Sequence, residues 1–199
     1  MVQNGILERI GKGIFRIGKN QTFLHEISYQ QKTLYRKLHE KFPYSQFCVW
    51  NTNLLNEFSK HQSNTNFMLI EVEKDSIQAV FYNLKENRNN IFLEPSNEVI
   101  ENYLLQQKNP IIIKTLISEA PVQIVQNIPV PTIEKILVDL YCDSNLFFPY
   151  QGKELHTIFQ EVFSKYTVNQ SKILRYSSRR GRKKEIMEYL NMNQIIGNK

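Results

Sequence analysis

The segment Glu71-Val-Glu73-Lys74 comes closest, by residue type and spacing, to a catalytic set. Metal-dependent nucleases hold Mg²⁺ with acidic residues on neighbouring strands and place a lysine next to them, typically as Glu-x-Lys. Here the two carboxylates alternate along a strand, but the lysine comes one position too early for that motif. We therefore expect Glu71 and Glu73 to end a strand at its solvent rim, and a divergent metal-dependent nuclease is the least favoured functional alternative.

Other catalytic residue types are present but do not form recognisable sets. No two histidines have the i, i+4 spacing of a helical zinc site. The two cysteines, Cys48 and Cys142, form no disulfide framework and are expected to be small buried hydrophobes. The sequence contains no Gly-x-Ser-x-Gly elbow, no glycine-rich phosphate loop and no dinucleotide fingerprint. These observations predict a protein that is not an enzyme and that has no metal and no cofactor.

The net charge of +6 is concentrated at the two ends of the chain. Residues 1–170 contain 17 basic and 17 acidic residues, whereas residues 171–199 contain eight basic and two acidic ones. Within the first part, residues 1–20 carry Arg9, Lys12, Arg16 and Lys19 against Glu8 alone. Basic ends around an acidic middle favour contact with a polyanion.

The apolar pattern predicts an α/β (α+β mixed) fold, in which a mixed β-sheet is flanked by helices. Short apolar runs alternate with helical periodicity between residues 29 and 114, and Val122–Val125 is expected to add an edge strand. From Thr132 onward the pattern is helical only. The predicted strands are Phe47–Trp50, Phe67–Val72, Ile91–Leu93 and Pro110–Lys114, and the predicted helices are 29–41, 75–84, 99–105, 132–142, 153–166, 171–178 and 183–191.

The first 20 residues are predicted to form a unit of their own. Two short apolar stretches, Ile6–Ile10 and Ile14–Ile17, flank Gly11-Lys12-Gly13, which is typical of a β-hairpin with glycines at the turn. A lone hairpin is barely stable in water, so it must pack on something. We assign residues 1–20 to this hairpin and residues 21–199 to the main domain, whose residues 129–199 form a helical, basic part.

The segment VPTIEKILVDLY, residues 130–141, predicts a capped amphipathic helix. Thr132 is a favourable N-cap and Glu134 lies in the first turn, where the helix dipole favours a negative charge. Lys135 and Asp139 are i, i+4 neighbours on the side away from the apolar face, and we expect them to pair there.

A dense basic cluster follows near the C-terminal end. Gly181 is expected to end one helix before the next begins. The cluster predicts a nucleic-acid-binding surface, with a dock for an acidic partner protein and a merely solvated end as alternatives. Its members are Arg175, Arg179, Arg180, Arg182, Lys183 and Lys184.

In this order, the hairpin ILERIGKGIFRIG, the helix PTIEKILVDL and the tail NQSKILRYSSRRGRK resemble the AbiEi-type antitoxins. These are the transcriptional-regulator halves of bacterial type IV toxin–antitoxin pairs. The resemblance implies a winged helix-turn-helix domain, whose wing is the hairpin, ahead of a larger α/β domain. It also implies DNA binding, autoregulation, and neutralisation of a partner toxin of the nucleotidyltransferase type, and it singles out Glu134, Lys135 and Asp139.

The chain departs from the family pattern at its beginning. A winged-helix module takes roughly 60–70 residues and places its recognition helix ahead of the wing. Only about 20 residues precede the next domain here, so we interpret the hairpin as the wing of a shortened module. Such a wing can bind phosphates but cannot choose an operator, because base edges are read by a helix in the major groove.

No apolar run reaches the roughly 18–20 residues that a membrane span requires, and residues 1–20 lack the apolar region of a secretory signal, which together predict a cytoplasmic protein without membrane contacts. The alternative to the DNA-binding regulator is a protein-interaction module that blocks a partner enzyme without touching DNA.

Overall fold

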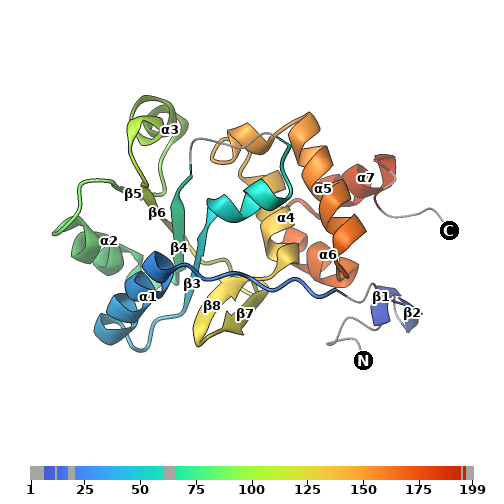
Figure 1. Ribbon diagram of the computed structural model, residues 1–199, viewed down its shortest axis with the longest axis horizontal. Coiled ribbons are helices and arrows are strands. Elements are labelled where there is room, and N and C mark those ends of the chain that lie inside the picture. Colours follow the sequence, from blue (N-terminus) through green and yellow to red (C-terminus); the bar gives the residue numbers. More distant parts are fainter. Residues whose placement is uncertain (1–6, 12, 18–20, 61–65, 194, 196–199) are drawn as a thin grey trace.

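The computed structural model describes residues 7–11, 13–17, 21–60, 66–193 and 195 (Figure 1). Its strands are β1 (Leu7–Gly11), β2 (Ile14–Ile17), β3 (Phe47–Asn51), β4 (Met68–Val72), β5 (Ile91–Leu93), β6 (Ile111–Thr115), β7 (Val122–Val125) and β8 (Ile128–Pro131). Its α-helices are α1 (Tyr29–Lys41), α2 (Ile77–Lys85), α3 (Asn97–Asn102), α4 (Ile133–Cys142), α5 (Lys153–Lys165), α6 (Gln170–Arg179) and α7 (Lys183–Met192). Short 3-10 helices are η1 (Thr52–Glu57), η2 (Lys74–Ser76), η3 (Leu104–Gln106) and η4 (Phe148–Tyr150).

A four-stranded mixed sheet forms the centre of the fold, in the order β3-β4-β6-β5. β3 is antiparallel to β4, whereas β4, β6 and β5 run parallel to one another. β4 is buried along its whole length because helices cover both faces of the sheet. This burial explains why the strands read as nearly continuous apolar runs, and it confirms the predicted mixed sheet flanked by helices.

The two faces of the sheet support two separate apolar cores. Val49, Ile70 and Ile113 point to one face, where they pack with residues of α1 and α2. Their neighbours along the strands, such as Trp50 and Leu69, point to the other face and join a larger core with the helices from α4 onward. The strict alternation of side chains along a strand divides the apolar residues between these cores.

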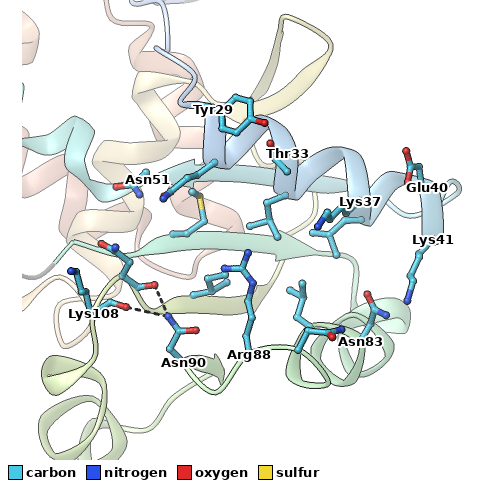
Figure 2. A pocket seen from close by; sticks show the side chains of 18 residues that line it. Tyr29, Thr33, Lys37, Glu40, Lys41, Asn51, Asn83, Arg88, Asn90 and Lys108 are labelled. Atoms are coloured by element: carbon cyan, nitrogen blue, oxygen red, sulfur yellow. Dashed lines mark hydrogen bonds between the residues drawn. The ribbon is translucent and has the colours of Figure 1, made fainter.

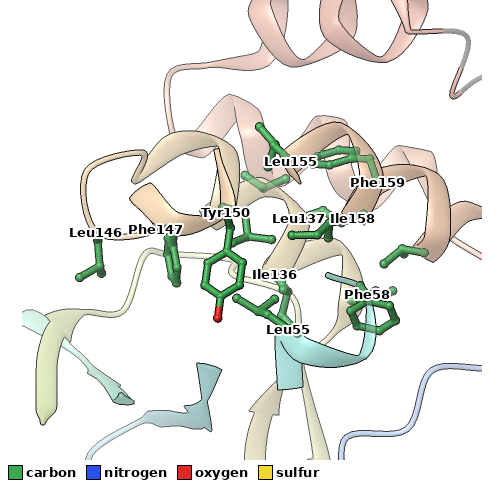
Figure 3. Packing of buried hydrophobic residues seen from close by; sticks show 14 of the residues in the cluster. Leu55, Phe58, Ile136, Leu137, Leu146, Phe147, Tyr150, Leu155, Ile158 and Phe159 are labelled. Atoms are coloured by element: carbon green, nitrogen blue, oxygen red, sulfur yellow. The ribbon is translucent and has the colours of Figure 1, made fainter. Parts of the chain in front are cut away.

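Helix α4 is the centre of the larger core. Figure 3 shows Ile136 and Leu137 of α4 beside Ile158 and Phe159 of α5, with Tyr150 of η4 packed next to them. Every residue of α4 from position 133 to position 140 is buried. The prediction of a helix with one exposed side was therefore wrong: α4 is covered all round, and its charged residues must find partners inside the protein.

Strand β7 forms at the predicted residues but does not extend the central sheet. It pairs with β8 in a separate two-stranded sheet, and the connecting residues Gln126 and Asn127 have φ values of 49° and 64°. Two positive φ values are typical of a type I′ hairpin turn, and the usual sequence at such a turn is Asn-Gly or Asp-Gly. This sequence signal is lacking here, so β8 was not predicted; its prolines, Pro129 and Pro131, lie in an edge strand, where proline is tolerated.

The predicted N-terminal hairpin is confirmed as β1 paired with β2. The strands are antiparallel, with Arg9 opposite Phe15 and Glu8 opposite Arg16, and Gly13 has a φ of 75° at the turn. β1 lies against α6, so the first strand of the chain meets a helix near its other end (Figure 1). This contact supplies the packing partner that an isolated hairpin lacks.

None of the helices in the described part of the chain combines the length and the apolar character that crossing a membrane requires.

Candidate nucleic-acid interface

Five of the six basic residues predicted near the C-terminal end lie on an exposed surface formed by α6, α7 and the turn between them. Gly181, with a φ of 68°, ends α6 as predicted, and the Arg182 backbone N–H donates to the Ser177 carbonyl at 2.9 Å. The turn joins α6 directly to α7, so their exposed cations follow one another closely along the chain. We call this surface the α6/α7 basic surface; its members are Arg175, Arg179, Arg182, Lys183 and Lys184.

Three of the five cations on this surface form ion pairs with described residues, and all three pairs are exposed. Arg179 pairs with Glu119, Arg182 pairs with Glu185 at 3.2 Å, and Lys184 stands 4.0 Å from Glu188. Within the residues that the structure describes, Arg175 and Lys183 have no ion pair. Exposed ion pairs contribute little to stability and are screened by salt. All five cations of the surface are therefore available to phosphate groups.

The N-terminal hairpin comes next to this surface. Because β1 lies against α6, the two basic ends of the chain are brought together, although more than 150 residues separate them in the sequence. The backbone of Arg9 and Arg16 belongs to the hairpin, while their side chains, together with the whole of Lys12 and Lys19, lie outside the described residues.

Arg180, the sixth residue of the predicted cluster, has a different environment. Its side chain is only 12% exposed, with Nη1 3.3 Å from Asp139 Oδ1 and Nη2 2.8 Å from Asp143 Oδ1. Burial opposes the positive charge, but the two carboxylates outweigh it and raise the pKa of the guanidinium. Arg180 therefore belongs to a buried ionic network beneath the surface rather than to the surface itself.

The centre of this network is Lys135 on α4. Its Nζ lies 2.7 and 2.6 Å from the two carboxylate oxygens of Glu71 and 2.5 Å from Asp139 Oδ2. The Tyr176 hydroxyl donates to Asp139 Oδ1 at 2.9 Å, and the Tyr176 ring lies 5.6 Å from the lysine Nζ. All three donors of the ammonium group thus have acceptors.

These contacts correct two predictions made from the sequence. Glu71 was expected at the solvent rim but is 2% exposed in the middle of the fold, and Glu73 lies beyond the end of β4. Lys135 and Asp139 do pair, as expected, but inside the protein rather than on a solvated side. The physical reason is that α6 covers the side of α4 that the apolar periodicity left open.

The network arises from three regular spacings. Across the sheet, the register places Cys48, Glu71 and Lys114 opposite one another on β3, β4 and β6. Along α4, the spacing i, i+4, i+8 presents Lys135, Asp139 and Asp143 on one side, the last of them just past the helix end. On α6, Tyr176 and Arg180 are four residues apart.

The charges of the network balance. Lys114 closes it with a 2.8 Å salt bridge to Asp143, so three cations face three carboxylates. Burial raises the pKa of Glu71, and Lys135 acts against that rise. For Lys135 itself, burial lowers the pKa, but Asp139 and Glu71 outweigh it and raise the pKa well above its usual value. Such mutual compensation is what buried charges require in order to persist.

This arrangement is suited to holding helices in place. Burial and the nearby Glu71 raise the pKa of the Cys48 thiol, which makes it a poor nucleophile. In the part of the chain that the structure describes, no three His, Cys, Asp or Glu side chains converge in a way that could hold a metal ion. Every charged group in the network is already engaged by another one.

All three residues singled out by the family resemblance contact α6 or its cap. Glu134 Oε1 accepts a hydrogen bond of 2.9 Å from the backbone N–H of Asn169, the N-cap residue of α6. Asp139 binds Tyr176 and Arg180, and Lys135 joins Asp139 to Glu71 on the sheet. The network therefore fixes α6, and with it the basic surface, relative to the central sheet.

Sequence reasoning missed the partners of this motif, namely Glu71, Lys114, Asp143 and Tyr176. One signal was available for Glu71, because a carboxylate within the apolar run MLIEV has to be either exposed or paired. Nothing comparable distinguished Tyr176 or Arg180 from their neighbours, since their partners lie 37 and 41 residues away in the sequence.

Comparisons with known proteins place the chain in a family. Residues 1–196 match the model of a family of unknown function, DUF6577, and the chain belongs to that family. Among curated proteins, none matches the chain.

Proposed function

We propose that this member of the DUF6577 family is a non-enzymatic regulator that binds the phosphate backbone of DNA with the α6/α7 basic surface and the adjoining β1–β2 hairpin. One observation carries the proposal: β1 lies against α6, so the two basic ends of the chain meet. A continuous field of positive charge attracts a polyanion more strongly than two separate patches do.

The buried network supports the same proposal. DNA binding by phosphate contacts needs cations at fixed positions relative to one another, because phosphate contacts set the register of a protein on the duplex. Glu134, Asp139 and Arg180 tie α6 to α4, and Lys135 with Glu71 ties α4 to the sheet. In this proposal, the family-motif residues position the binding surface and do not contact DNA themselves.

The resemblance to AbiEi-type antitoxins extends the proposal to a partner. We infer that the chain acts in the cytoplasm as an antitoxin-like regulator and neutralises a toxin of the nucleotidyltransferase type. Co-purification with the product of the adjacent gene tests this part, with a chain whose α6/α7 basic surface is neutralised as the comparison. Recovery of a protein that is not a nucleotidyltransferase, or of none, would count against it.

Binding of a duplex of about 25 base pairs at increasing salt tests the DNA part. The logarithm of the association constant should fall linearly with the logarithm of salt concentration, with a slope of about −0.9 for each phosphate contacted. Unrelated duplex sequences should bind alike, because phosphate contacts carry no sequence information. Absence of binding at 50 mM salt would refute the DNA-binding proposal.

A further inference from the structure

A second basic site lies on the opposite face of the sheet, in a groove of about 780 Å³ between α1 and the segments after α2 and before β6 (Figure 2). Met68 and Ile111, the first residues of the parallel strands β4 and β6, line it. The groove is separate from the α6/α7 basic surface, because α1 and α2 cover one face of the sheet and the later helices cover the other.

Positive charge predominates in this groove. Lys37, Lys41, Arg88 and Lys108 line it, and Glu40 is its only acidic lining residue among those described. None of these four cations forms an ion pair with any residue that the structure describes. Lys41 lies in the last turn of α1, where the helix dipole favours a cation, but the other three have no such reason for their positions. Four unpaired cations in a hollow that holds one carboxylate favour an anionic ligand.

Two of the cations lie on opposite walls of the groove. Figure 2 shows Arg88 extending from the loop after α2 toward α1, which carries Thr33 and Lys37 on the side that faces the groove. A guanidinium group presents two parallel N–H donors that match a phosphate, and a lysine adds a point charge. This part of the groove is suited to a phosphate monoester.

The wall that carries Lys108 is held in place by a side chain. Asn90 Nδ2 donates to the carbonyls of Lys108 at 3.1 Å and Asn109 at 2.9 Å, and Asn109 has a φ of 50° (Figure 2). A left-handed backbone of this kind persists where surrounding contacts hold it. The loop is therefore fixed with its lysine at the groove.

The far end of the groove offers groups that suit a nucleobase. Tyr29, the first residue of α1, and Asn51, the last residue of β3, line this end, away from Lys41 and Asn83 at the other end (Figure 2). Tyr29 is 83% exposed, which leaves its ring free for stacking. Asn51 Oδ1 accepts a hydrogen bond of 2.8 Å from the Asn53 backbone N–H, and its Nδ2 can donate to a base edge. Asn83 and Asn87 add further amide groups along the lining.

We propose that this groove binds a mononucleotide, with the phosphate between Arg88 and Lys37 and the base toward Tyr29 and Asn51. The volume lies within the range of about 300–1,000 Å³ that is usual for small-ligand sites. The site uses none of the residues assigned to DNA binding. A negative result for nucleotide binding would therefore leave the DNA-binding proposal untouched, and the reverse also holds.

Calorimetric titration of the full chain tests the proposal, with adenosine 5′-monophosphate, adenosine and inorganic phosphate as three separate probes. The nucleotide should bind at least about 10-fold more tightly than either of the other two, because only it engages both ends of the groove. Arg88→Gln and Lys37→Gln should each weaken its binding by about 10-fold, the effect expected for losing a charge-assisted hydrogen bond. Both residues are exposed, so circular dichroism should show an unchanged fold.

Lys85→Gln is the matched control, because this exposed lysine at the end of α2 points its Nζ to the Asn89 carbonyl and does not line the groove. It should leave nucleotide binding unchanged. The proposal is overturned if the nucleotide does not bind at millimolar concentration, or if adenosine or inorganic phosphate binds as tightly as the nucleotide. It is also overturned if Arg88→Gln and Lys37→Gln both bind the nucleotide like the unmodified chain.

Discussion

Lys135 on α4 and Glu71 on β4 lie 64 residues apart in the sequence and form a buried salt bridge, with Nζ 2.6 Å from Oε2. The lysine side chain is completely buried, and the glutamate side chain is 3% exposed. This pair joins the helix that carries the family-motif residues to the central sheet.

Replacing Lys135 with methionine should strongly destabilise the protein. The substitution leaves Glu71 buried without its partner and removes one partner of Asp139, and breaking a buried pair in this way costs about 3–5 kcal/mol. Urea unfolding measures the loss. Lys184→Met is the control, because this exposed lysine stands 4.0 Å from Glu188 on the surface, and its replacement should leave the unfolding midpoint almost unchanged.

The double variant Glu71→Leu/Lys135→Met tests whether the instability of Lys135→Met comes from leaving the Glu71 carboxylate buried without a partner. Removing both charges leaves no uncompensated carboxylate on β4, and Asp139 keeps its contacts with Tyr176 and Arg180. The double variant should therefore be more stable than Lys135→Met. An equal or greater loss in the double variant would mean that Glu71 does not depend on Lys135.

Glu134→Ala should loosen the beginning of α6. The Asn169 backbone N–H loses its acceptor in a half-buried place, at a cost of about 1–3 kcal/mol. Hydrogen exchange should accelerate at the first amides of α6 and much less in α5. Glu134→Gln keeps an oxygen acceptor at this position and should restore most of the protection; failure of this rescue would contradict the assigned hydrogen bond.

The fold class could be predicted from the sequence because it depends on local periodicity. Runs such as Phe47–Trp50 and Ile91–Leu93 are short and apolar, and the helical stretches have apolar residues every three or four positions, so strands and helices identify themselves. The β7–β8 hairpin was not predicted as a hairpin, because Gln126 and Asn127 adopt positive φ without the usual Asn-Gly sequence. The local rule failed where an uncommon residue occupied the turn.

The buried network could not be predicted in the same way. Arg180 looks like any other member of the basic run, and only the position of α6 against α4 assigns it to Asp139 and Asp143. A periodicity argument places Lys135 on the open side of its helix, yet that side is covered by a helix that begins about 35 residues later. Which element covers a given face is a property of the tertiary structure, and local patterns do not encode it.

His25 should make the protein less stable in mild acid. Burial lowers its pKa from 6.5 to about 4, although a hydrogen bond with Gln31 acts in the opposite direction. Between these two values the unfolded chain binds a proton that the folded chain does not, so stability is lost as the pH falls from about 6.5 to 4.

Urea midpoints measured between pH 7 and pH 4 check this prediction. The full effect of such a shift is about 3 kcal/mol. His25→Phe removes the titrating group and should flatten the profile in this pH range, even if the variant starts from a different stability. A profile of the same slope in the variant would assign the acid sensitivity to another group.

Gly181→Ala should destabilise the junction of α6 and α7. Gly181 has a φ of 68°, and a residue with a Cβ in the left-handed region costs about 1–2 kcal/mol. Thermal unfolding measures the loss of stability. Because the turn sets the relation between Arg179 and Lys183, the variant should also bind duplex DNA more weakly; an unchanged affinity would contradict a role for this turn in positioning the surface.

The central claim is that the two basic ends of the chain form one DNA-binding surface, and the salt dependence of duplex binding tests it most directly. Arg175→Gln/Lys183→Gln removes two surface cations without breaking an ion pair among the described residues. Arg9→Gln/Arg16→Gln removes two cations from the hairpin. Lys85→Gln on α2 serves as the control. Arg175→Gln/Lys183→Gln should reduce the magnitude of the salt slope by about 2. The hairpin variant should reduce it by about 1, because Arg9 and Arg16 occupy register positions on opposite faces of the hairpin, and the fourfold variant by about 3. If the hairpin variant keeps the slope of the unmodified chain while the α6/α7 variant loses it, the hairpin is not part of the surface and the claim is contradicted.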